Sequence, residues 1–93
     1  MSKLGEAKTQ LLTARENYTE ACRLSATDRA DYRMIRYQAY QALKEAEIDL
    51  IDIAIDQAEE QTGHRIGNYE SLIKDSVLRR KAADLALCLR EVG

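Results

Sequence analysis

The segment Glu45–Glu60, EAEIDLIDIAIDQAEE, decides the fold. On a helix at 100° per residue, five of its acidic side chains fall on one narrow stripe, and the rest of the cylinder is mainly apolar. This acidic stripe consists of Glu45, Asp49, Asp52, Asp56 and Glu59. A helix that is apolar over roughly two-thirds of its circumference is buried on most sides. We therefore predict that this segment is the centre of the fold, with Leu50, Ile51 and Ile55 buried beneath the other helices.

Composition agrees with a small helical protein. The 93 residues include no proline and only four glycines, and 45% of them are hydrophobic. Most of the frequent residue types are good helix formers. Phe and Trp are absent, so the core must be aliphatic. We predict one all-α domain, residues 1–93, with three helices: a helical hairpin with a long central helix, followed by a bent or interrupted C-terminal helix.

The first two helices are predicted over about residues 2–24 and 28–62. In the first, large and small apolar residues alternate with a 3.5-residue repeat, which favours close packing against one neighbour. This seam consists of Leu4, Ala7, Leu11, Ala14, Tyr18 and Ala21. The short connection between the helices predicts an antiparallel pair. Gly63 is suited to end the second helix.

The third helix is predicted over about residues 69–91, and its apolar pattern changes face partway along. We expect a break near Asp75, whose side chain can cap a new helix. Beyond the break, apolar residues form a second face, the leucine row, which consists of Leu78, Ala82, Leu85 and Leu89. Apolar patches of this kind rarely stay open in soluble proteins, and two-fold pairing is the commonest way to cover them. We therefore predict a homodimer with the leucine row at or beside its interface.

Charge is distributed unevenly along the chain. Residues 1–44 carry eight Lys or Arg against five Asp or Glu, a balance of +3. Residues 45–63 carry seven acids and no base, a balance of −7. Residues 64–93 carry six bases against four acids, a balance of +2. These blocks indicate charge pairing within the chain or between subunits.

Two surfaces are candidate partner-binding sites. The first is the acidic stripe, which is either a solvated face, a docking strip for a basic partner or phosphate mimic, or a site for a hard cation. The second is the Arg/Tyr face in the first half of the second helix. It consists of Arg29, Arg33, Arg36, Tyr40 and Lys44, with Tyr37 flanking it. Interleaved Arg and Tyr can bind phosphate and stack on bases, or can pair with acids of a neighbouring chain.

Nothing in the sequence predicts catalysis or a cofactor. No phosphate-binding loop, nucleophile elbow or zinc signature occurs, and His64 lacks accompanying catalytic residues. Cys22 and Cys88 match no metal or redox spacing, and we expect two reduced thiols in a cytoplasmic protein. No secretory leader is evident, and no apolar run approaches the roughly 20 residues of a membrane span. We expect a protein that is not an enzyme and has no metal, cofactor or membrane anchor.

The favoured function is a non-enzymatic interaction protein that binds and regulates or inhibits a macromolecular partner, most simply another protein. Small helical proteins with acidic patches are common among phage and mobile-element products, and by this association we expect such an origin. The alternative is a DNA-binding regulator with a helix-turn-helix-like segment around residues 57–74, ending its first helix at Gly63. In that reading, phosphate contacts come from Lys74, Arg79, Arg80 and Lys81. The long first helix and its neighbouring −7 block oppose it.

Overall fold

The computed structural model describes residues 2–23, 30–64 and 69–90. Within these ranges the regular structure is all-α, as predicted. Four helices follow in order: α1 (Lys3–Arg23), α2 (Ala30–Thr62), α3 (Glu70–Lys74) and α4 (Ser76–Leu87). The molecule is elongated, 52 × 28 × 15 Å, because α2 alone, at 33 residues and 1.5 Å per residue, is about 50 Å long.

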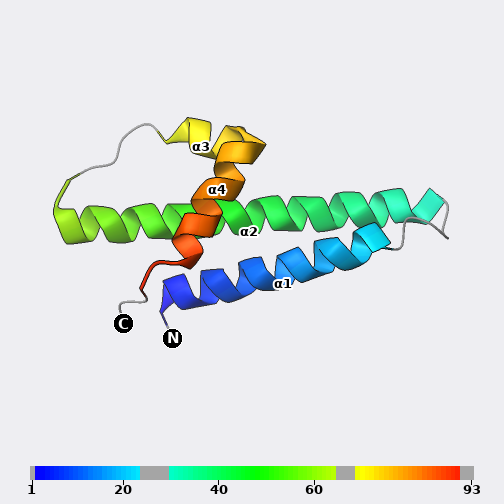
Figure 1. Ribbon diagram of the computed structural model, residues 1–93, viewed down its shortest axis with the longest axis horizontal. Helices are drawn as coiled ribbons and strands as arrows, with labels where there is room; N and C mark the ends of the chain where they lie inside the picture. Colours follow the sequence, from blue (N-terminus) through cyan, green and yellow to red (C-terminus); the bar gives the residue numbers. More distant parts are fainter. Residues whose placement is uncertain (1, 24–29, 65–68, 91–93) are drawn as a thin grey trace.

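Helices α1 and α2 run antiparallel and form the predicted hairpin (Figure 1). Their observed bounds agree with the predicted ranges, although the expected start of the second helix at residue 28 lies outside the described residues. At the other end of α2, Gly63 has φ +72°, and its amide donates to the carbonyl of Glu59 over 2.9 Å. This left-handed conformation is the one expected of a glycine that ends a helix.

The core lies where the seam of α1 meets the middle of α2. Of the seam, Leu4, Ala7, Leu11, Ala14 and Ala21 are buried, and Tyr18 is partly buried. The residues from Leu4 to Ala14 pack with Ala46 and Leu50 of α2, and both Leu11 and Leu50 are completely inaccessible to solvent. The alanines bring the two backbones close, while the leucines fill the space between them. The seam predicted from the 3.5-residue repeat is thus confirmed.

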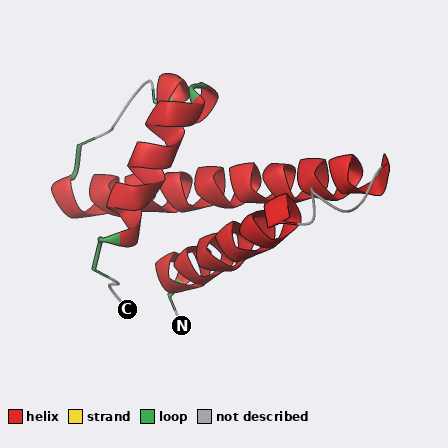
Figure 2. Ribbon diagram, turned by 45° about the vertical axis from the view of Figure 1, so that its right-hand side comes forward, coloured by secondary structure: helices red, strands yellow, loops and turns green. Residues whose placement is uncertain are grey.

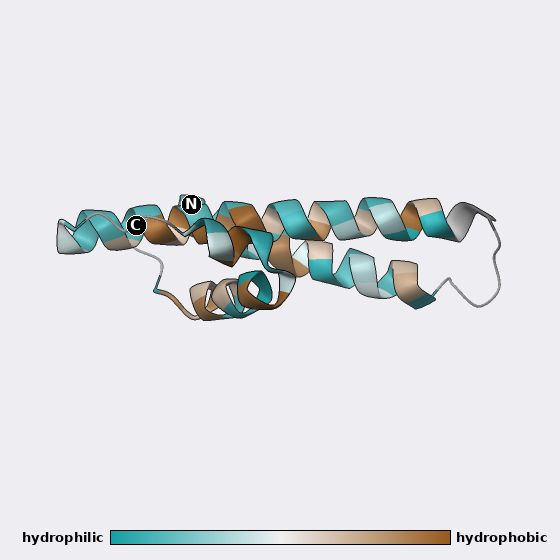
Figure 3. Ribbon diagram, turned by 90° about the horizontal axis from the view of Figure 1, so that it is seen from above, coloured by the Kyte–Doolittle hydropathy of each residue, from teal (hydrophilic) through white to brown (hydrophobic). Residues whose placement is uncertain are grey.

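The half of α2 nearer Gly63 is less covered than predicted. Leu50 and Ile51 are buried as expected, but Ile55 is only partly buried, so that part of the prediction is wrong. The reason is geometric: α1 and α4 cover the central part of α2, and the end that carries Gly63 extends beyond them (Figure 1). This end is also mostly hydrophilic (Figure 3), so its exposure costs little apolar burial.

The predicted interruption of the third helix occurs at Asp75. This residue has extended backbone angles, φ −85° and ψ 118°, and separates α3 from α4. Its carboxylate accepts hydrogen bonds from the backbone amides of Val77 and Leu78, at 2.9 and 3.2 Å. Asp75 therefore caps α4, satisfying two amides that have no partner within the helix. At its other end α4 finishes at Leu87, earlier than the predicted residue 91.

Helix α4 crosses α2 instead of running alongside it (Figures 1 and 2). Its buried face consists of Arg79, Ala83 and Ala86, and the two alanines belong to the core. The leucine row lies elsewhere on the helix and beyond its end: Leu78, Leu85 and Leu89 are exposed and Ala82 is partly buried. Apart from Arg79, helix α4 thus buries small side chains and leaves Val77, Leu78 and Leu85 exposed.

No helix in the described part of the chain combines the length and the apolar character needed to cross a membrane.

Candidate partner-binding site

The Arg/Tyr face is an uncovered surface on the first half of α2. Arg33, Arg36 and Tyr40 are exposed, whereas Arg29 lies outside the described residues. Tyr37, beside them, is 61% exposed, and Met34 on the same stretch of helix is equally so. The stretch therefore offers cationic, aromatic and aliphatic side chains to solvent together.

Tyr40 is held in place by a second aromatic ring. The rings of Tyr40 and of Tyr18 on α1 have centroids 5.9 Å apart and an interplanar angle of 55°. With Arg33, Arg36 and Tyr37 they line a shallow hollow of about 330 Å³. The Arg/Tyr face is therefore concave where α1 meets it.

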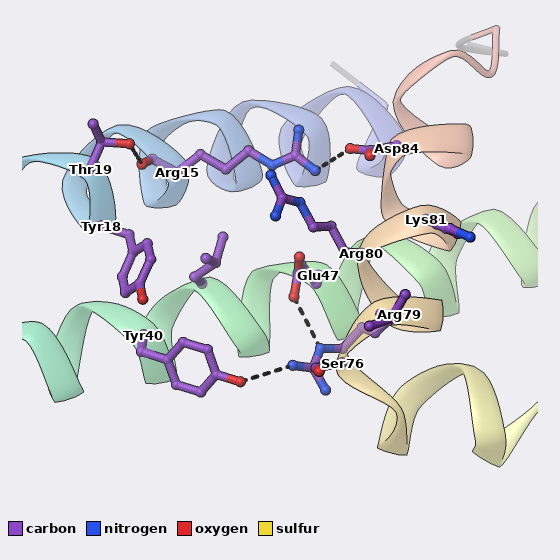
Figure 4. A pocket seen from close by; sticks show the side chains of 12 residues that line it. Arg15, Tyr18, Thr19, Tyr40, Glu47, Ser76, Arg79, Arg80, Lys81 and Asp84 are labelled. Carbon is purple, nitrogen blue, oxygen red and sulfur yellow. Dashed lines mark hydrogen bonds and ion pairs between the residues drawn. The ribbon is translucent and has the colours of Figure 1, made fainter. Parts of the chain in front are cut away.

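A larger cleft of about 790 Å³ adjoins this hollow, between α1, α2 and α4. The two share Tyr18 and Tyr40. The remaining lining of the cleft is mainly polar: Arg15, Thr19, Leu43, Glu47, Ser76, Val77, Arg79, Arg80, Lys81 and Asp84 (Figure 4). Four cations and two acids give this lining a net charge of +2.

One wall of the cleft contains a buried ion pair that sequence reasoning missed. Arg79 Nε donates to Glu47 Oε1 over 3.0 Å, and the two side chains are only 4% and 7% exposed. The remaining nitrogens of Arg79 donate to the carbonyl of Ile73 at 2.8 Å and the hydroxyl of Tyr40 at 3.4 Å. The sequence did contain a signal, because Glu47 projects about 200° from Glu45 on the helix, opposite the acidic stripe and among apolar residues.

The other cations of the cleft are more accessible. Arg15 of α1 pairs with Asp84 of α4 near the protein surface, where its side chain is 31% exposed. Arg80 and Lys81 are exposed, and neither side chain donates to another described residue in a hydrogen bond or ion pair. In Figure 4 the side chain of Arg80 extends from α4 toward Arg15. Arg79, proposed from the sequence as a phosphate contact, is buried and forms an ion pair with Glu47.

The acidic stripe is not a uniformly open surface. Glu45, Asp49 and Asp56 are exposed, whereas Asp52 and Glu59 are partly buried. Burial raises the pKa of the Asp52 carboxyl, and the nearby carboxylates of Asp56 and Asp49 raise it further.

Tyr69 covers the stripe at Asp52. The Tyr69 side chain is hydrogen-bonded to Asp52, which partly opposes the rise in the pKa of that carboxyl. In turn, the negative charge of Asp52 is the main reason that the pKa of Tyr69 is raised. One carboxylate of the predicted binding strip is therefore engaged within the chain. Among the described residues, no group of three or more His, Cys, Asp or Glu side chains is arranged to hold a metal ion.

The segment predicted as helix-turn-helix-like differs from a DNA-reading unit in its second helix. Helix α3 has only five residues, and its Lys74 faces Glu70 at 3.6 Å. The part of the predicted turn at residues 65–68 lies outside the described residues.

Comparison with models of known protein families, with curated proteins and with solved structures finds no significant match.

Proposed function

We propose that this chain is a non-enzymatic interaction protein that binds a protein partner through the Arg/Tyr face and thereby regulates or inhibits it. The observation that carries the proposal is the exposure of Arg33, Arg36, Tyr37 and Tyr40 together on one face of α2, with exposed Met34 at its edge. Arg, Tyr and Met are enriched in protein interfaces, and Tyr and Arg often dominate their binding energy. A rigid helix presents them at little cost in conformational entropy.

The Arg/Tyr face is favoured over the acidic stripe for a physical reason. Asp52, at the centre of the stripe, is partly buried and already hydrogen-bonded to Tyr69. The stripe also lacks large apolar side chains, which supply most of the affinity at the centre of an interface. Its like charges suit a solvated surface that separates copies of the protein.

The experiment compares capture of partners from a cell lysate by matched variants. Arg36→Glu and Tyr37→Ala alter exposed positions of the Arg/Tyr face, and Asp49→Lys with Asp56→Lys alters exposed positions of the stripe. Circular dichroism checks that each variant stays folded. We expect a protein captured by the parent chain to be lost with either face variant and retained with the stripe variant. The opposite pattern would assign binding to the acidic stripe and overturn the proposal.

Nucleic-acid binding is the competing outcome. Affinity for duplex DNA that comes from phosphate contacts falls steeply with salt. We expect no measurable duplex binding at physiological ionic strength in a fluorescence anisotropy titration. Sub-micromolar binding that weakens with salt and is abolished by Arg80→Gln would instead support the DNA-binding regulator.

We further propose that the protein acts as a homodimer in the cytoplasm. Support for pairing comes from the leucine row, where Leu85 is 73% exposed on a helix that buries its opposite face. Leu78 and Leu89 are exposed beside it. A second copy would remove these side chains from water, and closed two-fold pairing is the commonest arrangement for such a surface.

A further inference from the structure

The hollow of the Arg/Tyr face and the adjoining cleft form one cationic trough along α2. The trough is lined by the cations of the hollow, the cations of the cleft, and three tyrosines. Its charged lining consists of Arg15, Arg33, Arg36, Glu47, Arg79, Arg80, Lys81 and Asp84. Six cations and two acids give a net charge of +4. From Arg33 to Glu47 the trough follows α2 for fourteen residues, or about 21 Å.

The charges in the trough are not all neutralised within the chain. Glu47 neutralises Arg79, and Asp84 pairs with Arg15. Arg80 and Lys81 have no such partner among the described residues, and the guanidinium of Arg80 extends toward that of Arg15 (Figure 4). Arg15 already has Asp84 as its anion, so Arg80 is the guanidinium of this end that no described carboxylate neutralises. This end of the trough is therefore suited to accept a carboxylate, which a guanidinium binds through two parallel hydrogen bonds.

The middle of the trough has a different chemistry from its ends. Tyr18, Tyr37 and Tyr40 lie between the cations of the Arg/Tyr face and those of α4. Tyrosine rings offer a broad apolar surface with little side-chain entropy to lose. The sequence of surfaces along the trough is cationic, aromatic and cationic again.

We infer that the trough binds an extended acidic peptide segment of the partner, with carboxylates at both ends and apolar side chains between them. This inference rests on the proposed function and adds the chemistry of the partner and the participation of α4. An extended strand advances about 3.3 Å per residue, so about six residues span the trough. Arg80, with Lys81 beside it, binds the carboxylates at one end, and Arg33 and Arg36 bind those at the other.

A peptide fits this surface better than a single-stranded nucleic acid. A nucleic acid carries a negative charge at every nucleotide. Asp84 within the trough is 54% exposed and opposes such a uniform charge, and the buried Glu47 leaves no net positive charge on Arg79 to attract it. Tyr18 and Tyr40 also pack against one another, which leaves less ring surface for stacking bases. A peptide can place neutral side chains opposite the acids.

The test uses labelled peptides and fluorescence anisotropy with the full chain. The probe is Glu-Glu-Leu-Leu-Glu-Glu, and the controls are Gln-Gln-Leu-Leu-Gln-Gln and Glu-Glu-Ser-Ser-Glu-Glu. Arg80→Gln and Arg36→Gln each remove one charge from an end of the trough. Arg90→Gln removes the same charge from an exposed position outside its lining. All three positions are exposed, so the fold should be preserved.

We expect the acidic probe to bind, and both control peptides to bind at least about five-fold more weakly. We expect Arg80→Gln and Arg36→Gln to weaken the affinity for the probe about five-fold or more. We expect Arg90→Gln to change this affinity less than about two-fold, because a small number of contacts supply most of the binding energy. Equal effects of all three variants would overturn the inference, because they would show attraction to net charge alone. Tighter binding of oligothymidylate than of the peptide, with the same dependence on Arg80, would overturn it in favour of nucleic acid.

Failure of this inference can be told apart from failure of the proposed function. If the acidic probe does not bind, but a lysate protein is still lost with Tyr37→Ala and retained with Arg80→Gln, the Arg/Tyr face binds its partner without the trough. If neither variant affects capture of that protein, both proposals fail.

Discussion

Arg79 on α4 and Glu47 on α2 form a hydrogen-bonded ion pair of 3.0 Å in which both side chains are almost wholly withdrawn from water. Removing one partner leaves the other buried and uncompensated, which costs about 3–5 kcal/mol. We expect Glu47→Ala to lower the free energy of unfolding by about that amount in urea denaturation. As a control, Asp84→Ala breaks the exposed pair with Arg15 and should cost about 1 kcal/mol or less.

A double variant separates the contribution of the Glu47–Arg79 ion pair from the contribution of side-chain packing at the same site. Glu47→Leu with Arg79→Met removes both charges and keeps apolar volume, so it should recover most of the stability that Glu47→Ala loses. Equal losses for Glu47→Ala and Asp84→Ala would show that the burial of this pair is not an energetic feature of the fold.

Adjacent leucines on α1 provide a matched test of the core. Leu11 is completely buried against α2, and Leu12 is 52% exposed. We expect Leu11→Ala to lower the free energy of unfolding by about 2–5 kcal/mol, because it leaves a cavity in the core. Leu12→Ala should change it by about 0.5 kcal/mol or less, as do most surface substitutions. Similar losses for the two variants would contradict the packing of α1 on α2.

The cap of α4 has a measurable contribution. Asp75 accepts hydrogen bonds from two backbone amides at the start of the helix. We expect Asp75→Ala to lower the free energy of unfolding by about 1 kcal/mol, whereas Asp75→Asn or Asp75→Ser should retain most of it. The order of thermal midpoints, measured by circular dichroism, checks this. If the Asn and Ser variants melt with the Ala variant, the cap does not stabilise α4.

Asp52 makes a contribution that depends on pH. Burial, with help from Asp56 and Asp49, raises the pKa of its carboxyl in the folded protein. The folded state therefore favours the protonated form, and the resulting stabilisation is complete below the ordinary pKa of 3.8 and is lost as pH rises through the folded value. We expect Asp52→Asn to raise stability at pH 7 by a few tenths of a kcal/mol, through relief of like-charge repulsion along the helix, and to have little effect near pH 3.

The hydrogen bond from Tyr69 gives this prediction an internal check. That bond lowers the pKa of Asp52, so Tyr69→Phe should raise the pKa further. An NMR titration of the Asp52 carboxyl in the two proteins measures the change. A lower pKa in the Tyr69→Phe variant would show that Tyr69 does not stabilise the ionised carboxylate.

Dimerisation is expected through the leucine row. Leu85 is the most exposed of these side chains, and its replacement by Lys would introduce a charge into the proposed interface. We expect sedimentation at micromolar concentration to give twice the 10.6 kDa chain mass for the parent protein and the chain mass for Leu85→Lys. Leu12→Lys, at an exposed position of α1, is the matched control, and this variant should remain dimeric. A parent protein that sediments as a monomer would contradict the proposal.

Features that depend on a regular repeat or on neighbouring residues were predictable from the sequence. The repeat from Leu4 to Ala21 indicated the seam of α1, because one neighbour covers it along its whole length. Asp75 was predictable as a cap because its side chain acts on backbone amides two and three residues away. Gly63 was predictable because glycine readily adopts the left-handed conformation that ends a helix.

Contacts between distant segments were not predictable from periodicity. The pattern of α4 drew attention to its leucines, yet the helix packs through Ala83 and Ala86. Small residues score weakly in any apolar pattern, although they permit the closest approach of two backbones. The pairing of Glu47 with Arg79 depends on where α4 crosses α2, and no local pattern in the sequence predicts that crossing. Of the candidate site, the Arg/Tyr face was therefore found from the sequence, and the part of the cleft contributed by α4 was not.

The alanine face of α4 has a consequence for how the helix is positioned along α2. Ala83 and Ala86 present a smooth surface, and by themselves they would permit a helix to slide or rotate by a residue with little change in buried area. Arg79 removes that freedom, because its three nitrogens donate to Glu47, to the carbonyl of Ile73 and to Tyr40 from one position only. The register between α4 and the hairpin is thus set by the directional hydrogen bonds of Arg79. The close packing of the two alanines does not set it.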